Sequence, residues 1–312
     1  MKVLVTGGEG FLGSHLVDAL IARGDAVVVV DHRQKNKHRF PNPKAIFYPI
    51  AFGDPQMKEV LLAERPDAIA HLAAQISVTR SIENPVMDAE RNILDSLQLL
   101  QSASAAGVRK LVFASSGGAI YGDHPKRPTP LLDNAQPLSP YGVAKQSFER
   151  YLHYFKQQHG LDYVSLRFSN LFGARQQVTK PVGEGNVISL FLDRMLVTGE
   201  PITIFGDGTS SRDFLYIDDA IQAILKSFDQ PFVGAVNVGT GKATTVTGLY
   251  AALTEIHGSI HPVINLPYRK GEVMHSVIHP GTAKKLLNWQ AKVPFKTGLE
   301  QTYAWYKDYF GK

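Results

Sequence analysis

Tyr141 and Lys145 are the residues of this sequence whose types and spacing most clearly predict chemistry. They stand four positions apart, and on a helix this spacing places both side chains on one face. A free tyrosine titrates near pH ~10 and a lysine slightly higher, so neither alone is a good base at neutral pH. A positive charge beside a phenol favours the phenolate, so we expect Lys145 to lower the pKa of Tyr141 toward the range that acid/base catalysis requires. The same spacing arises by chance on amphipathic helices. Whether this pair is catalytic therefore depends on the elements that position it.

A glycine-rich loop lies near the start of the chain, between a strand pattern and a helix pattern. Residues 2–6 are rich in β-branched side chains, Gly7, Gly10 and Gly13 follow, and an apolar helical repeat comes next. Glycines let the backbone approach a pyrophosphate, and the helix N-terminus offers unpaired amides to the phosphates. Because the spacing differs from Gly-x-Gly-x-x-Gly, a purely structural turn is the alternative.

The next strand pattern favours a dinucleotide. The apolar run 26–30 ends at Asp31, eighteen residues after Gly13, where an acid binds an adenosine ribose hydroxyl. A carboxylate at this position would repel a 2′-phosphate, so NAD is favoured over NADP. Arg33 is the opposing signal, because a nearby arginine accommodates that phosphate.

Further strand patterns alternate with helix patterns, at residues 68–72, 88–106 and 110–114. This alternation predicts an α/β fold with a Rossmann-like, doubly wound parallel sheet. Ligands of such sheets bind beyond the carboxyl ends of the strands. Ala73, Ala74, Ser115, Ser116 and Tyr141 would all lie at that edge, so the motifs converge on one cleft.

Composition narrows the classes of function. The 312 residues are 44% hydrophobic and 20% charged, with a net charge of +5 and no cysteine. The lack of cysteine excludes disulfides, thiol nucleophiles and cysteine metal sites, and it fits a reducing compartment. The sequence has no apolar run of membrane-spanning length, no paired histidines at metal-ligand spacing and no nucleic-acid recognition motif. We therefore expect a cytoplasmic protein with no metal, membrane or nucleic-acid partner.

Four motifs, in order along the chain, carry a resemblance to a known family. They are Thr6-Gly7-Gly8-Glu9-Gly10-Phe11-Leu12-Gly13, His71-Leu72-Ala73-Ala74, Tyr141-x-x-x-Lys145 and Arg167-Phe168-Ser169-Asn170-Leu171-Phe172-Gly173. Together they resemble the extended short-chain dehydrogenase/reductase superfamily, with its NAD-dependent epimerases and dehydratases. Within it, the chain is most similar to the UDP-glucose 4-epimerases, and the resemblance runs almost end to end.

The resemblance implies a catalytic trio of a serine, Tyr141 and Lys145 acting with NAD. Tyr141 would take the proton of the sugar 4-hydroxyl while NAD accepts the C4 hydride; after the ring turns over, both would be returned to give the 4-epimer. The serine is Ser116 or its neighbour Ser115, and the motif leaves both open. The implied cofactor-binding residues are Gly7, Gly10, Phe11, Leu12, Gly13, Asp31, His32, Leu72, Ala73, Ala74, Asn92, Tyr141 and Lys145.

Neighbouring reactions of the superfamily differ in the residues around the serine. The 4,6-dehydratases typically have Asp-Glu where this chain has Gly118 and Ala119, so dehydration lacks an evident acid and base. The uronate 4-epimerases that resemble this chain tend to have Thr at Asn170 and Arg at Gln177, which favours a neutral hexose here. A UDP-uronate 4-epimerase stays an alternative, because arginines such as Arg175 can hold a sugar carboxylate.

The substrate side is expected after residue 172, where short elements and a Pro- and Gly-rich stretch replace the regular alternation. By resemblance, Ser276 lies at the wall of the sugar pocket. A small residue there leaves room for a 2-acetamido group, so we expect UDP-GlcNAc to be accepted as well as UDP-glucose. The implied substrate-binding residues are Ser77, Ser116, Tyr141, Asn170, Asn186, Val187, Arg212, Arg269, Glu272 and Ser276.

The same change of pattern sets the expected domain boundaries. Residues 1–172 plus about 212–242 are expected to form an NAD-binding Rossmann domain, and about 173–211 plus 243–312 a smaller α/β domain for the nucleotide sugar. The resemblance also implies a homodimer through a four-helix bundle, built from the helices near 88–106 and 141–159.

Two further functions are compatible with this framework. One is a one-way, NADP-linked reductase of a 4-keto nucleotide sugar, and the other is a non-catalytic NAD-binding regulator. The intact Tyr141 and Lys145 disfavour the regulator.

Overall fold

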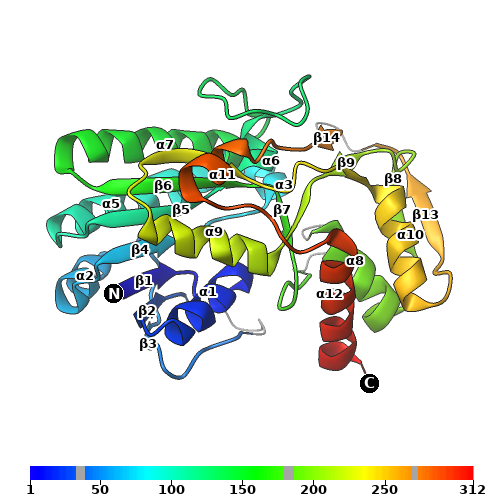
Figure 1. Ribbon diagram of the computed structural model, residues 1–312, viewed down its shortest axis with the longest axis horizontal. Helices are drawn as coiled ribbons and strands as arrows, with labels where there is room; N and C mark the ends of the chain where they lie inside the picture. Colours follow the sequence, from blue (N-terminus) through cyan, green and yellow to red (C-terminus); the bar gives the residue numbers. More distant parts are fainter. Residues whose placement is uncertain (33–38, 179–185, 269–272, 312) are drawn as a thin grey trace.

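A seven-stranded parallel sheet forms the centre of the molecule (Figure 1). The computed structural model describes residues 1–32, 39–178, 186–268 and 273–311. The strand order is β11-β6-β5-β4-β1-β2-β3, which places the first strand inside the sheet and confirms the doubly wound arrangement. The strands are β1 (Lys2–Thr6), β2 (Ala26–Val30), β3 (Ile46–Tyr48), β4 (Ala68–His71), β5 (Lys110–Ser116), β6 (Asp162–Phe168) and β11 (Gly234–Val238).

Helices cover both faces of this sheet (Figure 1). Side chains alternate between the faces of a strand, so Val3 and Val5 of β1 pack into one core while Leu4 packs into the other. Both faces are apolar because both are covered, which explains the continuous hydrophobic runs of β1 and β2. One face packs against α1 (Phe11–Ala22) and α9 (Ile217–Asp229), and the other against α2 (Met57–Glu64), α5 (Asp95–Ala105) and α7 (Pro140–His159).

Two helical segments contain a π-helical turn. The helix expected at 88–106 consists of α4 (Pro85–Ala89), the π-turn η1 (Glu90–Leu94) and α5. In the second half of the chain, α8 (Val187–Asp193) continues into the π-turn η2 (Arg194–Thr198). A π-turn shifts the direction of the side chains around it and is frequent at functional sites.

The second half of the chain adds small sheets outside the central one (Figure 1). β9 (Ser211–Arg212) lies between β12 (Thr244–Thr245) and β14 (His275–Ser276), β10 (Phe214–Tyr216) pairs with β7 (Asn170–Phe172), and β13 (Val263–Leu266) pairs with β8 (Ile202–Phe205). Helices α8, α10 (Val246–His257) and α12 (Phe295–Phe310) lie with β8 and β13 at one end of the molecule. The exact boundaries of the two domains stay a prediction. Three short helices, α3 (Val78–Glu83), α6 (Gly117–Ile120) and α11 (Gly281–Leu287), complete the described elements.

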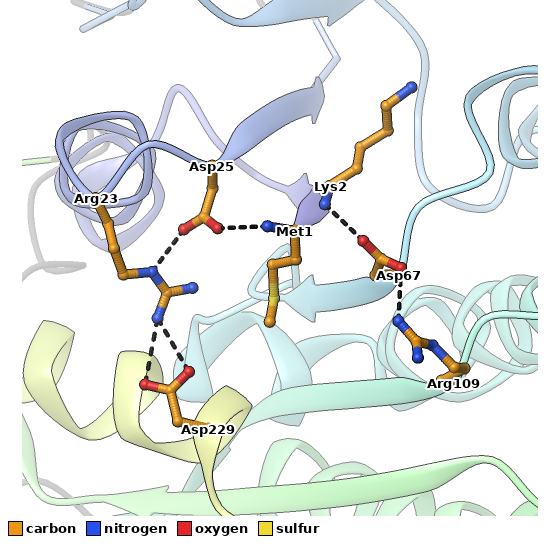
Figure 2. Close-up of polar contacts among 7 residues, drawn as sticks. All are labelled: Met1, Lys2, Arg23, Asp25, Asp67, Arg109 and Asp229. Carbon is orange, nitrogen blue, oxygen red and sulfur yellow. Dashed lines mark hydrogen bonds and ion pairs between the residues drawn. The ribbon is translucent and has the colours of Figure 1, made fainter.

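A cluster of charged groups fastens the amino-terminal edge of the central sheet (Figure 2). Asp25, just before β2, accepts hydrogen bonds from the Met1 amino group at 2.9 Å and from Arg23 Nε at 2.6 Å. Asp67, just before β4, accepts from the Lys2 backbone N–H at 2.8 Å and from Arg109 at 2.7 Å. Since these contacts hold the amino ends, the opposite, carboxyl edge is left for ligands.

Candidate active site

The glycine loop between β1 and α1 forms a close-packed turn. Gly7 adopts φ +72°, and a Cβ on Gly13 would lie 2.0 Å from the Gly7 carbonyl oxygen, so neither position tolerates a side chain without a shift of the backbone. Helix α1 begins at Phe11 with no side-chain cap and no acidic residue in its first turn. Uncapped amides and the positive end of the helix dipole therefore face outward at the loop, an arrangement that fits a pyrophosphate.

Asp31 lies beside this loop, at the carboxyl end of β2. Its Oδ2 accepts a hydrogen bond from the Glu9 backbone N–H at 3.0 Å. Arg39 forms an ion pair with the Glu9 carboxylate and donates to the His32 carbonyl at 2.6 Å. The arginine charge is thereby neutralised, so the described surroundings of Asp31 suit a ribose hydroxyl better than a 2′-phosphate. The predicted NADP signal, Arg33, lies outside the described residues.

The exit of β4 is tied to β1 by a buried hydrogen-bond chain. Thr6 Oγ1 accepts from the backbone N–H groups of Leu72 and Ala73, both at 3.2 Å, and its hydroxyl contacts His71 Nδ1 at 2.9 Å. Burial lowers the pKa of His71 to about 3, and the charge of Lys145 adds to this effect. His71 is thus a neutral structural group that holds the predicted cofactor residues 72–74 against Gly7.

Tyr141 and Lys145 both lie on the first turns of α7, as the spacing predicts. Ser139 caps the helix by accepting a hydrogen bond from the Gly142 backbone N–H, which stabilises the start of α7. Lys145 is 4% exposed, and its Nζ donates to the Ala114 carbonyl at 2.9 Å. The ammonium nitrogen lies 5.6 Å from the centroid of the Tyr141 ring.

The pKa of Tyr141 is shifted in the opposite direction from the one expected. Burial raises it, the negative charge of Asp88 raises it further, and a hydrogen bond with Ser116 acts in the lowering direction. Burial also lowers the pKa of Lys145 to about 8, against the raising influence of Asp88 and Glu149. The prediction was wrong for the protein by itself, because burial of the phenol and the charge of Asp88 outweigh the lowering effect of the Ser116 hydrogen bond.

The structure separates the two candidate serines at the end of β5. Consecutive side chains of a strand point to opposite sides, and only one of these two hydroxyls faces the phenol. Ser116 hydrogen bonds with Tyr141 and also caps α6 by accepting from the Ala119 backbone N–H at 3.2 Å. The buried Ser115 instead donates to Glu149 Oε1 at 2.6 Å. Ser116 is therefore the hydroxyl placed for chemistry.

Replacing each serine with alanine should give opposite results. Ser116→Ala should lower kcat by about 10²-fold, because the phenol loses its hydroxyl partner at the reacting edge. Ser115→Ala should leave kcat within a few-fold and cost about 1 kcal/mol of unfolding free energy, because it removes one buried hydrogen bond. Steady-state kinetics and urea unfolding measure the two effects, and a larger loss of kcat in Ser115→Ala would reverse the assignment.

A buried ion pair that the sequence reasoning missed lies behind Ser115. Arg167 of β6 contacts the carboxylate of Glu149 on α7 at 2.6 Å, with side chains 5% and 7% exposed. Arg167 also donates to the Tyr121 hydroxyl at 3.0 Å and to the Leu132 carbonyl at 2.6 Å. The pair thus joins α7 to the sheet. The sequence signal that could have revealed it is the charged Arg167 at the start of the otherwise mostly apolar motif 167–173.

On the substrate side, the predicted residues Asn170 and Ser276 both lie next to Gly118. A Cβ on Gly118 would lie 3.5 Å from Ser276 Oγ and 3.7 Å from Asn170 Oδ1. Asp213, fully buried, organises this wall: its carbonyl accepts from the Asn170 N–H at 2.9 Å, and its own N–H donates to the Ser276 carbonyl at 2.9 Å. Its carboxylate accepts from the backbone N–H groups of Thr240 and of residue 241 at 2.9 and 3.0 Å. Asn170 and Ser276 are therefore brought together next to the serine turn.

The remaining predicted substrate residues that the structure describes have structural roles. Ser77 caps α3, and Asn186 caps α8, whose first residue is Val187. The Arg212 guanidinium donates to the backbone carbonyls of Ser211 and Met274, at 2.9 and 3.1 Å. The predicted pyrophosphate and ribose ligands Arg269 and Glu272 lie outside the described residues.

Comparison with known proteins agrees with this geometry. Residues 3–239 match the family described as the NAD dependent epimerase/dehydratase family. A putative UDP-glucose 4-epimerase of Methanocaldococcus jannaschii is 37% identical over 98% of each chain. The chain belongs to the NAD-dependent epimerase/dehydratase family. NAD is therefore the cofactor, and the predictions of the family and of an enzyme resembling UDP-glucose 4-epimerase are confirmed.

Solved structures extend the likeness to the whole fold of this epimerase/dehydratase family member. The UDP-glucose 4-epimerase of Thermotoga maritima, determined with UDP-glucose, has a TM-score of 0.94 and 42% identity, covering 99% of both chains. The UDP-N-acetylglucosamine 4-epimerase of Methanobrevibacter ruminantium, in complex with UDP-N-acetylmuramic acid, has a TM-score of 0.91 and 32% identity, covering 99% of this chain and 98% of that one. The predicted Rossmann-like fold class is confirmed.

Several predicted cofactor residues of this family member are arranged in a way that suits NAD. The glycine cradle fits the pyrophosphate, Asp31 fits a ribose, and Lys145 reaches the carboxyl edge beside Ala114. Asn92, on η1, holds the chain after the predicted residues 72–74 by pairing with the Gln75 backbone N–H and carbonyl, both at 2.9 Å. Within the described ranges, no helix has the length and apolarity to cross a membrane, and no group of three His, Asp or Glu could hold a metal.

Proposed function

We propose that this enzyme interconverts UDP-hexoses that differ at C4, with UDP-glucose and UDP-galactose as the principal pair. The observation that carries the proposal is the pairing of Tyr141 with Ser116 at the edge where Gly118 faces Asn170 and Ser276. A single phenol serves the sugar there, and glycine and alanine stand where a dehydratase has its carboxylates. A single acid/base that removes and returns one proton is suited to epimerisation and not to elimination of water.

Each residue of the trio has one task in this reaction. Tyr141 accepts the proton of the sugar 4-hydroxyl and later returns it, and Ser116 shares that proton through its hydroxyl. Lys145 holds the nicotinamide ribose with its ammonium hydrogens and contributes positive charge near the phenol. When bound, NAD supplies reversible acceptance of the C4 hydride.

The raised pKa of Tyr141 gives the enzyme a resting state with a neutral phenol. A neutral phenol is a poor base at neutral pH, so proton removal needs further positive charge near the ring. The cationic nicotinamide of bound NAD would supply this charge together with Lys145. The tyrosine would therefore act as a base only in the loaded enzyme.

The alternatives are less well supported by the site. Arg175, one candidate for holding a uronate carboxylate, forms an ion pair with Asp18 at 2.8 Å and lies 5.3 Å from the centroid of the Phe40 ring. It is thus paired with a carboxylate of α1, which disfavours the uronate 4-epimerase. A non-catalytic regulator would not need Tyr141, Ser116 and Lys145 together. A one-way reductase would consume added cofactor, whereas an epimerase needs none added.

A finer question is which substituent the enzyme accepts at C2 of the sugar. We propose that UDP-GlcNAc is accepted as well as UDP-glucose. Its support is the small Ser276 facing the side-chain-free Gly118 and the likeness to a UDP-N-acetylglucosamine 4-epimerase. UDP-glucose, UDP-GlcNAc and UDP-glucuronate should be incubated with the enzyme at equal concentration and their 4-epimers separated by chromatography. Turnover of the first two supports the proposal. Turnover of UDP-glucose alone overturns the acceptance of UDP-GlcNAc, and turnover of the glucuronate alone overturns the neutral hexose.

We also propose a homodimer built on α4, α5 and α7. Apolar side chains on α4, η1 and α7 are exposed, namely Val86, Leu94, Val143, Tyr151 and Tyr154. A groove between α5 and α7 is lined by Leu97, Gln101, Ser104, Ala105, Tyr151, Tyr154, Phe155 and His159. Such a stripe is costly in water and is buried when a second copy packs its own helices against it.

Sedimentation of the purified enzyme tests the dimer. We expect a mass of twice 34.3 kDa, and Tyr154→Glu should shift the protein to the monomer mass, because it places a charge in the groove between α5 and α7. A wild-type protein that sediments as a monomer at micromolar concentration would refute the dimer.

A further inference from the structure

Asp88 is a buried carboxylate that the trio does not include. It lies in the first turn of α4 and is fully buried. Its Oδ1 accepts hydrogen bonds from Gln75 Nε2 at 2.8 Å and from Asn92 Nδ2 at 2.9 Å. Its Oδ2 has no hydrogen-bond partner among the residues described. Hydrogen bonds or a cation compensate the cost of burying a carboxylate, and since only Oδ1 is hydrogen bonded, a positive charge near Oδ2 would stabilise the charged form.

The cation that supplies this charge is on α7. Asp88 lines a cavity of about 460 Å³ together with Ser139, Pro140 and Ala144 of that helix. Lys145 is the next residue of α7 and is itself almost fully buried, with the Ala114 carbonyl as its acceptor. Burial raises the pKa of Asp88, and the charge of Lys145 acts to lower it. The two buried groups thus compensate each other across the α4–α7 contact.

The other charged groups near Lys145 are engaged or neutral. Glu149, one turn further along α7, is bonded to Arg167 of β6. His71 of β4 has a pKa of about 3, lowered by burial and then by Lys145, and is uncharged at neutral pH. Among the described groups that act on Lys145, Asp88 is therefore the carboxylate without a cation of its own.

We propose that Asp88 is a positioning residue of the catalytic pair, whose buried carboxylate is the counter-charge that sets the protonation states of Lys145 and Tyr141 without touching substrate or cofactor. The proposal rests on the proposed function, since it deepens the role of the same site. It also explains why Asp88, Gln75 and Asn92 are tied together: the two hydrogen bonds to Oδ1 hold the carboxylate in place and leave Oδ2 for the charge interaction.

The direction of the effect follows from the signs. The Asp88 charge raises the pKa of Lys145, which burial holds near 8, and it also raises that of Tyr141. Removing the charge lowers both. The charged ammonium is then lost at lower pH, so the alkaline limb of the pH profile moves down. The phenolate forms at lower pH, so the acidic limb moves down as well. The whole pH profile of kcat is therefore expected to move down by about one pH unit. Structural damage would instead lower the maximal kcat.

Asp88→Asn tests this proposal, because asparagine keeps an Oδ1 acceptor for Gln75 and Asn92 while removing the charge. The dependence of kcat on pH is measured with UDP-glucose, and NADH binding is measured by fluorescence over the same pH range without sugar. We expect both limbs, and the pH at which NADH affinity is halved, to move down by about one unit. Gln75→Met is the matched control: it removes the hydrogen bond but keeps the charge, and its limbs should not move.

Two results would overturn the proposal: limbs of Asp88→Asn that stay at the wild-type pH, whatever the level of activity, or an equal shift in Gln75→Met. If Asp88→Asn does not fold, Asp88→Ser carries the same expectation in the smaller volume. The binding arm separates this proposal from the function. A wild-type enzyme that turns over no UDP-hexose refutes the function, while a shifted NADH-binding midpoint in the variant still supports Asp88.

Discussion

Tyr141→Phe is expected to lower kcat for UDP-glucose by about 10²- to 10⁴-fold, since it removes the group that both takes and returns the proton of the 4-hydroxyl. The ring is retained, so packing on α7 and the position of Lys145 should be preserved. Thermal unfolding and the cofactor content of the purified protein should therefore match the wild type. Steady-state kinetics at several pH values measure the loss.

Tyr121→Phe is the matched control for this variant. The Tyr121 hydroxyl is also buried and hydrogen bonded, but its partners are Arg167 and Asn237, away from the reacting edge. Its removal should reduce stability and leave kcat within a few-fold. If Tyr141→Phe keeps a tenth or more of the wild-type kcat, the assignment of the acid/base is wrong.

Glu149→Ala should produce the largest loss of stability, about 3–5 kcal/mol of unfolding free energy, because it leaves the buried Arg167 without its partner charge. Burial alone would lower the pKa of Arg167, but the hydrogen bonds and charge of Glu149 raise it overall. The guanidinium therefore stays charged and cannot escape the cost by losing its proton. Urea unfolding of the two proteins measures the difference.

The double variant Glu149→Ala with Arg167→Met is the control for this prediction. Removing both charges should restore part of the lost stability, since the unpaired buried cation is then gone. A double variant that is as unstable as the sum of the two single variants would show that the two side chains do not interact. Ser115, which donates to Glu149, loses its acceptor in both backgrounds and so cancels from the comparison.

Local patterns were sufficient to predict the parts of the site that depend on one element. The glycine loop, Asp31 at the end of β2 and the common face of Tyr141 and Lys145 each follow from spacing within a short segment. The parallel sheet followed from the alternation of patterns, and it places the ends of β4 and β5 at one edge. For these features, the spacing of residues along the sequence determines their spacing in the structure, because the geometry of a single helix, strand or loop is known.

Features that depend on packing between distant elements were not predictable in this way. The structure distinguishes Ser115 from Ser116 because Ser115 donates to Glu149 on α7, far along the chain. The direction of the Tyr141 pKa shift depends on burial and on Asp88, neither of which the Tyr-x-x-x-Lys pattern contains. Asp88 and Asn92 do share one helix face, four residues apart, and this spacing was the one sequence signal for the cluster.

The central claim is that one tyrosine and a recycled cofactor invert C4 of a UDP-hexose. The most direct measurement is incubation of the purified enzyme with UDP-glucose in D₂O, with no cofactor added, followed by NMR of the sugar. The account predicts UDP-galactose with protium retained at C4, because the hydride returns to the carbon it left, and no net change in absorbance at about 340 nm, the band of reduced nicotinamide. Deuterium at C4 of the product, or turnover that requires added cofactor in stoichiometric amount, would contradict it.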